Sequence, residues 1–154
     1  MTPVSASVWP EHIGKNDFVL PRSETLVNAC VATLSDNSSR PLFHDKRGWI
    51  NRKDFLQRTL ELAGSFKQIG LKKGDRLAVI AETTPDFLTF FYGCQYAGLI
   101  PVPLPFPMHL GGKDAYIGQL KRMMQSARAA AAVASEDLIG YLREAAEGLQ
   151  TPMV

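Results

Sequence analysis

The residues that could perform chemistry are few in this chain, and they lie far apart in the sequence. His12, His44 and His109 fall on three separate segments, and neither Cys30 nor Cys94 stands near another metal ligand. A zinc site needs closely spaced Cys and His residues, and a disulfide framework needs several cysteines. The sequence therefore excludes both, and we expect the two cysteines to be small core residues in a reducing compartment.

One glycine-containing segment, residues 107–114 (PMHLGGKD), superficially resembles a phosphate-binding loop. Such a loop needs Gly where Pro107 stands and Ser or Thr where Asp114 stands, because its backbone cradles the phosphates and its hydroxyl holds magnesium. Gly111 and Gly112 are better explained as a turn into the following helix. The chain also lacks the G-x-G-x-x-G dinucleotide pattern and the G-x-S-x-G nucleophile elbow.

The charged side chains show no catalytic pattern either. Glu136 and Asp137 are adjacent carboxylates, but at an expected helix start the helix dipole explains them better than acid–base chemistry does. Four basic residues are typical of a solvated helix face: Lys113, Lys121, Arg122 and Arg128. We therefore assign no catalytic, cofactor-binding or metal-ligating residue, and the substrate-binding residues stay unassigned.

The composition fits one globular domain with an ordinary core. The 154 residues are 45% hydrophobic and 21% charged, and 17 Lys and Arg against 15 Asp and Glu give a net charge of +2. The basic residues are spread along the chain, so we expect no nucleic-acid partner. No charged residue occurs between Asp86 and Lys113, but four prolines interrupt this stretch, so we expect no membrane span. The N-terminus lacks a signal-peptide pattern, and the expected location is cytoplasmic.

Hydrophobic periodicity predicts an α/β chain with a short N-terminal hairpin. Residues 1–22 carry no sustained period and are expected to form an irregular arm, whereas residues 23–154 predict one α/β unit. The segments PLFHD and GWI predict the hairpin. Further strands are expected at 77–81, 99–102 and 130–134, and helices after five possible capping residues: Ser23, Asn51, Thr84, Asp114 and Ser135.

The helix after Asn51 is predicted to end at Gly70 in the left-handed conformation. Its apolar spacing predicts six inward residues: Phe55, Leu56, Leu60, Ala63, Phe66 and Ile69. The next segment, residues 77–81, is a continuous apolar run, as expected of a parallel strand buried on both faces. With the helix and strand that follow, it forms a βαβ unit, and the whole order indicates a mainly parallel βαβαβα sheet.

Two segments need closer interpretation. The alternating prolines in IPVPLPFP remove backbone donors from one side, so we expect this strand to pair briefly and then leave the sheet. In RAAAAVAS, the high helix propensity of alanine favours one uninterrupted helix over residues 114–147. A helix start at Ser135, and the rarity of so long a helix, favour a buried strand at 130–134 instead. We choose the strand, and the helix remains the alternative.

Several stretches resemble the adenylate-forming (AMP-binding) superfamily, which includes acyl-CoA synthetases, luciferases and nonribosomal adenylation domains. They run from GWINRKDF through GLKKGDRLAVIAETTPDF to RMMQSARAAAAVAS and cover about residues 40–135. FFYGCQYAGLIPVPLPFP is most similar to fatty acyl-AMP ligases, in which a Gly-Cys-x-Tyr-Ala-Gly run precedes a Pro-rich strand. The fold that this resemblance implies is the N-terminal part of the adenylate-forming enzyme fold.

The resemblance implies a parent enzyme that uses ATP and Mg²⁺ to convert a fatty acid to an acyl-adenylate. Fatty acyl-AMP ligases then pass the acyl group to the phosphopantetheine of an acyl carrier protein. The family's phosphate loop, aromatic-Thr-Glu motif and lid lysine have no counterpart in this sequence. We therefore expect residues 23–154 to be a partial N-terminal subdomain, truncated at Val154, that is inactive alone and binds no cofactor. Apolar surface left by missing strands is expected to make it self-associate.

Two alternatives remain open from the sequence. The first is that the parent enzyme is an acyl-CoA synthetase, because the features that separate the two subfamilies are expected beyond Val154. A free-standing, non-catalytic α/β binding or interaction module would also explain the missing motifs.

Overall fold

The computed structural model describes residues 28, 34, 40–45, 48–107 and 112–154. The arm predicted for residues 1–22 and most of the helix predicted after Ser23 lie outside the described residues. The described part contains every later element that the sequence predicts.

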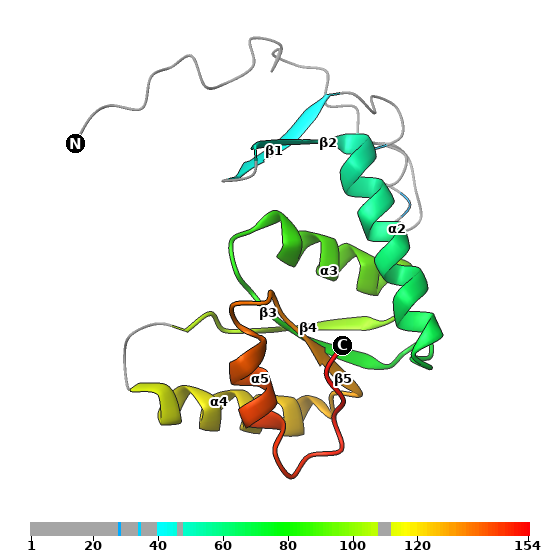
Figure 1. Ribbon diagram of the computed structural model, residues 1–154. Helices are drawn as coiled ribbons and strands as arrows, with labels where there is room; N and C mark the ends of the chain where they lie inside the picture. The colour runs from blue at the N-terminus through cyan, green and yellow to red at the C-terminus, as the bar shows by residue number, and fades with distance from the viewer. Residues whose placement is uncertain (1–27, 29–33, 35–39, 46–47, 108–111) are drawn as a thin grey trace, which may run out of the picture.

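A parallel sheet of three strands forms the centre of the described structure (Figure 1). β3 (Arg76–Ile80) lies between β4 (Ile100–Leu104) and β5 (Ala131–Val133), and both neighbours run parallel to it. Beyond β5, Met153 makes an isolated parallel bridge with Ala132. This topology confirms the α/β class with a mainly parallel sheet, and it confirms a strand within residues 130–134.

Helices cover both faces of this sheet. The four described helices are α2 (Arg52–Gln68), α3 (Pro85–Tyr96), α4 (Gly112–Ala127) and α5 (Ile139–Ala146). Successive side chains of β3 point to opposite faces. Leu77 and Val79 therefore pack in one core with α3 and the C-terminal half of α2, whereas Ala78 and Ile80 pack with α4 and α5. Figure 1 shows these two helical layers on either side of the strands.

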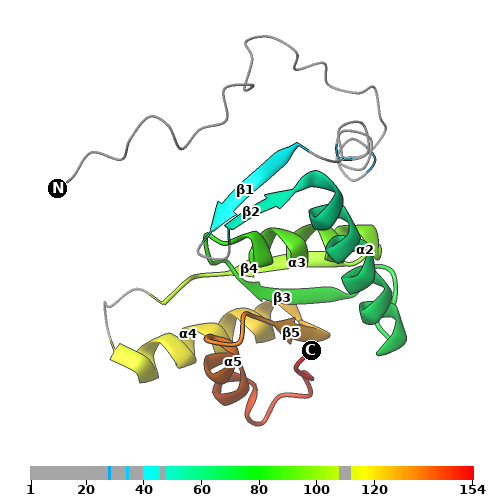
Figure 2. The ribbon, with the colours of Figure 1, turned by 45° about the horizontal axis from the view of Figure 1, so that its top comes forward.

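A hairpin packs on the side of α3 that faces away from the sheet (Figure 2). Its strands, β1 (Pro41–Asp45) and β2 (Gly48–Asn51), pair antiparallel and contribute to a third, smaller core with Phe55. Asn51 then caps α2, because its Oδ1 accepts a hydrogen bond from the backbone N–H of Asp54 at 2.8 Å. The predicted hairpin and this predicted cap are both confirmed.

α2 is buried along a narrower stripe than its sequence predicts. Phe55 and Ala63 are buried as expected, but Leu60 and Ile69 are 37% and 54% exposed, so the prediction is wrong for these two. Thr59 is buried in the same stripe, and its hydroxyl donates to the carbonyl of Phe55 at 2.8 Å. The physical reason is that α3 covers the middle of α2, and one helix covers only a narrow line of residues.

Two of the predicted helix caps, Asp114 and Ser135, are wrong. α4 begins at Gly112, so Asp114 lies inside its first turn. α5 begins at Ile139, and its predicted cap, Ser135, instead donates its hydroxyl to Oε2 of Glu82 at 3.0 Å. The backbone carbonyl of Ser135 accepts the N–H of Ile139, which makes a turn before the helix. The hydroxyl of Ser135 therefore bonds to a distant residue, Glu82, and does not cap the helix as the sequence predicts.

β4 pairs on one side in the described structure, as its prolines predict. On the β3 side, the N–H of Ile100 donates to the carbonyl of Asp75, and the carbonyl of Leu104 accepts the N–H of Ala81. Because backbone groups alternate along a strand, Pro101 and Pro103 direct theirs away from β3. The missing N–H groups therefore fall on the open edge, where they weaken the template for another strand. Residues 105–107 then leave the sheet without regular structure, which confirms the second half of the prediction.

Candidate functional site

A cavity lies at the carboxyl end of β3, and we call it the β3 cavity. Its volume is about 520 Å³. Nine residues line it: Phe43, His44, Ala81, Glu82, Thr83, Thr84, Pro85, Phe87 and Leu88. In open α/β sheets, ligands bind outside the carboxyl ends of the strands, where successive helices go to opposite faces. β3 meets this condition, since α3 follows it on one face whereas α4 and α5 lie on the other.

The floor of the β3 cavity is the loop that joins β3 to α3. Ala81 stays in register with the sheet, because its N–H donates to the carbonyl of Leu104 at 2.8 Å. Thr84 caps α3, and its Oγ1 accepts the N–H of Phe87 at 3.3 Å. Pro85 occupies the first turn, where a helix needs no N–H donor. This strand end and this cap fix the loop between them, as the sequence predicts for Thr84 and Pro85.

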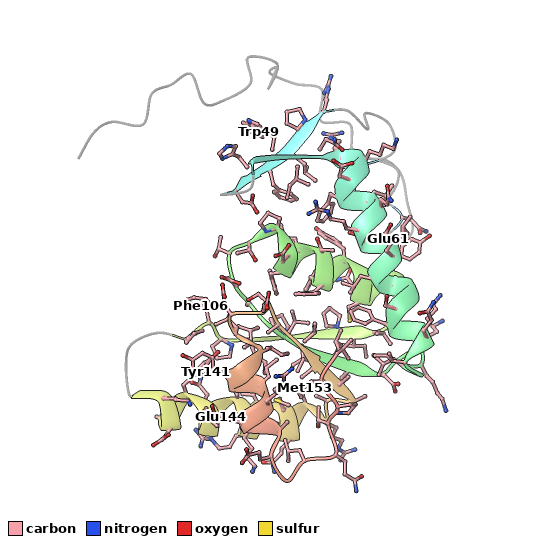
Figure 3. The ribbon with its side chains drawn as sticks, in the orientation of Figure 1. Trp49, Glu61, Phe106, Tyr141, Glu144 and Met153 are labelled. Carbon is pink, nitrogen blue, oxygen red and sulfur yellow. The ribbon has the colours of Figure 1, made fainter. Side chains whose placement is uncertain are left out.

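The hairpin contributes two of the lining residues, Phe43 and His44. The ring of Phe43 packs edge-on against Phe55 of α2, with the ring centroids 5.2 Å apart. His44 packs in the same manner on Trp49, with the centroids 4.8 Å apart. Figure 3 shows Trp49 on the side of the hairpin that faces away from α3. The ring of Phe43 is thus held by a second ring, whereas the ring of His44 lies with Trp49 on the other face of the hairpin.

Glu82 is the acidic residue of the β3 cavity, and it links two loops of the sheet. Its Oε2 accepts the hydroxyl of Ser135 at 3.0 Å, which joins the loop after β3 to the loop after β5. None of the nine lining residues in the described part of the chain is Lys or Arg. The described lining is therefore mostly apolar, and Glu82 is its one acidic residue.

A second, shallower cavity of about 280 Å³ lies between α2 and α3. Arg58 and Glu61 come from α2, and Asp86 comes from the first turn of α3. Glu61 also accepts a hydrogen bond from the side chain of Gln57 at 2.9 Å. This mixture of charges is typical of two solvated helix faces that meet at an angle.

The structure does not bring the candidate residues of the sequence into one site. His44 lines the β3 cavity, whereas His12, His109 and Cys30 lie outside the described residues. Cys94 is fully buried in the core as expected, and burial raises its pKa to about 12, so its thiol is inert near neutral pH. Within the described ranges, no three His, Cys, Asp or Glu side chains gather as metal ligands.

Two lysines of the predicted basic face reach across to α5. Nζ of Lys113 lies 2.7 Å from Oε1 of Glu144, and both side chains are well exposed. This hydrogen bond raises the pKa of Lys113, with the charge of Glu144 adding to it. Nζ of Lys121 donates to the carbonyl of Glu147 at 2.7 Å. Figure 3 shows Glu144 on α5, beside α4. The face is solvated, as predicted, but it also fastens α5 to α4.

Sequence reasoning missed Glu82 and Ser135 as a pair. They are 53 residues apart, in two separate stretches of the family resemblance, and neither stretch indicates that the two residues pair. Their one sequence signal is position, because each follows a strand, and the carboxyl ends of neighbouring parallel strands meet at one edge. That signal becomes usable only when β3 and β5 are known to be neighbours.

A family model matches most of this chain. Residues 31–152 match the family described as AMP-binding enzyme. The chain belongs to this family. The match spans most of the chain and confirms the superfamily resemblance of the sequence. Among the described helices, none combines the length and apolar character that a bilayer crossing requires.

Relatives of this AMP-binding chain include two bacterial proteins. It is 48% identical over 68 residues to a putative acyl-CoA synthetase of Caulobacter vibrioides, a match that covers 44% of this chain and 12% of the relative. It is 30% identical over 126 residues to the crotonobetaine/carnitine–CoA ligase of Salmonella paratyphi A, covering 80% of this chain and 23% of the relative.

Solved structures give the same fold. A structure from a study of fatty acyl-adenylate ligases from E. coli and L. pneumophila superimposes with a TM-score of 0.76 and 28% identity, covering 88% of this chain and 25% of that chain. A benzoate CoA ligase from Burkholderia xenovorans gives a TM-score of 0.70 at 18% identity, covering 82% and 24%, which shows the fold alone. The AMP-binding chain thus spans about a quarter or less of each of these four proteins.

Proposed function

We propose that this chain is the N-terminal part of a fatty acyl-AMP ligase, which activates a fatty acid with ATP to an acyl-adenylate for transfer to a carrier-protein phosphopantetheine. The observation that carries this proposal is the similarity to a fatty acyl-adenylate ligase structure, with a TM-score of 0.76 and 28% identity over 88% of the chain. The Gly93–Gly98 run, GCQYAG, and the Pro-rich β4 support the same subfamily.

The residues of this chain contribute scaffold rather than reacting groups in the proposed enzyme. A triphosphate needs cationic or backbone donors, and the β3 cavity offers an acidic residue with neither Lys nor Arg in its described lining. A magnesium site needs grouped carboxylates, and the described residues hold no such group. These described residues therefore do not fit ATP or Mg²⁺. Both belong to other parts of the proposed enzyme.

Fatty-acid-dependent ATP–pyrophosphate exchange tests whether the chain is active alone. We expect the purified chain to give no exchange above a heat-denatured sample, because its sequence lacks the phosphate loop and the lid lysine. A fatty acyl-adenylate ligase assayed beside it serves as the positive control. Clear turnover by the chain would show that the reacting groups lie within these 154 residues, contrary to the proposal.

An acyl-CoA synthetase is the second candidate, because the Caulobacter relative with that printed function is 48% identical over 68 residues. The acceptor separates the two candidates. The product of the whole open reading frame that contains this chain is incubated with a fatty acid, ATP and either CoA or a phosphopantetheinylated carrier protein. Acyl-carrier formation without acyl-CoA supports the first candidate, whereas acyl-CoA formation supports the second. Formation of neither favours a non-catalytic module.

We further propose that the isolated chain is cytoplasmic and self-associates. Several large apolar side chains of the described structure are between 44% and 54% exposed: Trp49, Ile69, Tyr96, Ile100 and Phe106. Exposed apolar surface favours association in water. Sedimentation velocity over a range of concentrations tests this, and a sedimentation coefficient that stays at the monomer value would contradict it.

A further inference from the structure

We propose that the amino edge of the parallel sheet is a docking surface for a membrane that carries anionic lipids. This edge lies opposite the β3 cavity, and its role is separate from the adenylation chemistry proposed above and does not depend on it. The cations of this amino-edge surface are Lys72, Lys73, Arg76 and Arg128, and all four are exposed. Its apolar members, also exposed, are Ile69, Tyr96 and Ile100.

The fold brings these residues together from distant parts of the sequence. The N–H of Ile100 donates to the carbonyl of Asp75 at 2.8 Å, and the N–H of Ala130 donates to the carbonyl of Arg76 at 2.8 Å. The residues that lead into β3 therefore lie between the starts of β4 and β5. Figure 1 shows that α2 ends beside the same edge of the sheet.

Charged and apolar side chains alternate on this edge. Arg76 and Ile100 are in register on adjacent parallel strands, so their side chains lie side by side on one face. The stem of Lys73 lies against Gly98, because a Cβ added at Gly98 would stand 3.2 Å from Cγ of Lys73. Gly98 in turn lies two residues from both Tyr96 and Ile100 along the chain.

The charge of the edge is strongly positive. Residues 67–76 and 125–130 together carry five Lys and Arg and a single carboxylate, Asp75. Glu147 follows α5 nearby, but Lys121 lies beside it and donates to its carbonyl at 2.7 Å. Within the described ranges, none of the four cations of the surface forms an ion pair. These charges are therefore available to an anionic partner.

Helix dipoles act in the opposite direction. α2, α3 and α4 all end at this edge, and three helix C-termini together carry about one and a half negative charges. This is less than the excess of four positive charges. Gly70, Gly98 and Arg128 already donate their N–H groups to the last turns of these helices. The basic side chains are therefore not needed as helix caps.

The backbone of Arg128 supports a role for its side chain. Among the described residues, Arg128 alone has a positive φ without being glycine, at +51°. Glycine is the usual residue in this conformation at the end of a helix, because a Cβ is strained there. Strain of this kind gathers at functional positions.

The apolar members of the surface favour a bilayer over other anions. Ile69, Tyr96 and Ile100 are 54%, 44% and 46% exposed. Isoleucine gains free energy by leaving water, and tyrosine rings favour the level of the lipid head groups. The phosphate backbone of a nucleic acid gives isoleucine no such contact. A second copy that presented the same edge would bring like charges together. An anionic bilayer accommodates both the cations and the apolar side chains.

Vesicle co-sedimentation with the unaltered chain tests the lipid preference. The vesicles are made of phosphatidylcholine alone or of an equimolar mixture with phosphatidylglycerol. We expect binding to the mixed vesicles that weakens as salt is raised, and about tenfold weaker binding to phosphatidylcholine alone. A duplex oligonucleotide with an equal concentration of phosphate groups is added as a competitor. No binding to the mixed vesicles, equal binding to both, or full release by the oligonucleotide overturns the proposal.

Matched double variants assign the binding to the amino edge. Lys72→Gln/Lys73→Gln removes two charges, each contributing about fivefold to partitioning, so we expect about twentyfold weaker binding to the mixed vesicles. Lys53→Gln/Lys113→Gln removes the same charge in the first turns of α2 and α4, away from this edge, and should bind as the unaltered chain does. An equal loss in both pairs would show that net charge alone acts and overturns the assignment.

A second pair of variants tests the contact of the apolar side chains with the bilayer. Ile69→Ser/Ile100→Ser keeps every charge, and we expect about fivefold weaker binding to the mixed vesicles. Trp49→Ser, on the hairpin, is the control because Trp49 is 48% exposed, and it should bind as the unaltered chain does. Far-ultraviolet circular dichroism verifies the fold of each variant. Full binding by the isoleucine pair overturns the choice of a bilayer as the partner.

Discussion

The contact between α2 and α3 gives a sharp prediction about one glycine. Gly93 lies inside α3, and a Cβ added there would stand 3.2 Å from the carbonyl oxygen of Thr59 and 3.3 Å from Cδ2 of Leu62. Gly64 lies inside α2, and a Cβ there meets nothing within 4 Å. The two glycines therefore separate the effect of helix propensity from the effect of packing.

The magnitudes follow from these two environments. Glycine to alanine in a helix interior raises the free energy of unfolding by about 1 kcal/mol, and this gain applies to both positions. At Gly93 the added methyl group presses on a backbone oxygen that belongs to another helix, and overpacking of this kind costs roughly 1–3 kcal/mol. We therefore expect Gly64→Ala to raise the free energy of unfolding. The free energy of unfolding of Gly93→Ala should be about 1–3 kcal/mol lower than that of Gly64→Ala.

Urea denaturation followed by far-ultraviolet circular dichroism measures both free energies. For a domain of this size, each 1 kcal/mol also moves the Tm by about 2–4 °C, which gives a second readout. The double variant Gly93→Ala/Leu62→Ala relieves the side-chain part of the clash but leaves the contact with the Thr59 carbonyl. If Gly93→Ala proves as stable as Gly64→Ala, the close approach of α2 and α3 described above is incorrect.

Three further predictions concern a cap, a thiol and a hydroxyl. Asn51→Ala removes the N-cap of α2 and should lower the free energy of unfolding by about 1 kcal/mol, whereas Asn51→Ser should retain most of it; urea denaturation distinguishes them. The pKa of Cys94 is raised to about 12 in the folded chain from an ordinary 9.0, so the stability from its burial is full below pH 9 and is lost as pH rises toward 12. Between pH 7 and pH 10 the unaltered chain should lose about 1 kcal/mol more stability than Cys94→Ala, and equal losses would contradict this. Tyr116→Phe removes the hydroxyl that donates to the Pro105 carbonyl at 2.8 Å and should cost about 1 kcal/mol in thermal denaturation, with Tyr141→Phe as the control that keeps the ring pair.

Burial and neighbouring charge give Tyr116 a second alkaline transition. Burial, with a smaller contribution from Tyr141, raises the pKa of Tyr116 to about 12. Its folded-state stabilisation is likewise present below the ordinary pKa of 10.0 and lost above it. Because Cys94 begins to lose its contribution one pH unit lower, the early part of the alkaline transition reports on the thiol.

Local sequence determined the elements whose signals lie within a few residues. Thr84, Pro85 and Asn51 act at helix starts through contacts three residues away or less, and these were predictable. Gly70 adopts a φ of +90° at the end of α2, as its sequence position predicts. The Pro-rich strand likewise carries its own constraint, because proline lacks a donor in any surroundings.

The tertiary structure decided what the local signals left open. Alanine prefers a helix, yet residues 131–133 form a strand because Leu77, Ala78 and Val79 of β3 offer them a parallel partner that an isolated segment lacks. Ser135 does not cap α5, because the pairing of β5 with β3 brings its hydroxyl to Glu82. The β3 cavity has the same origin, since its walls come from β1 and from the β3–α3 loop, which only the fold places together. Sequence patterns report contacts over a few residues, whereas contacts between distant strands depend on which strands lie next to each other in the sheet.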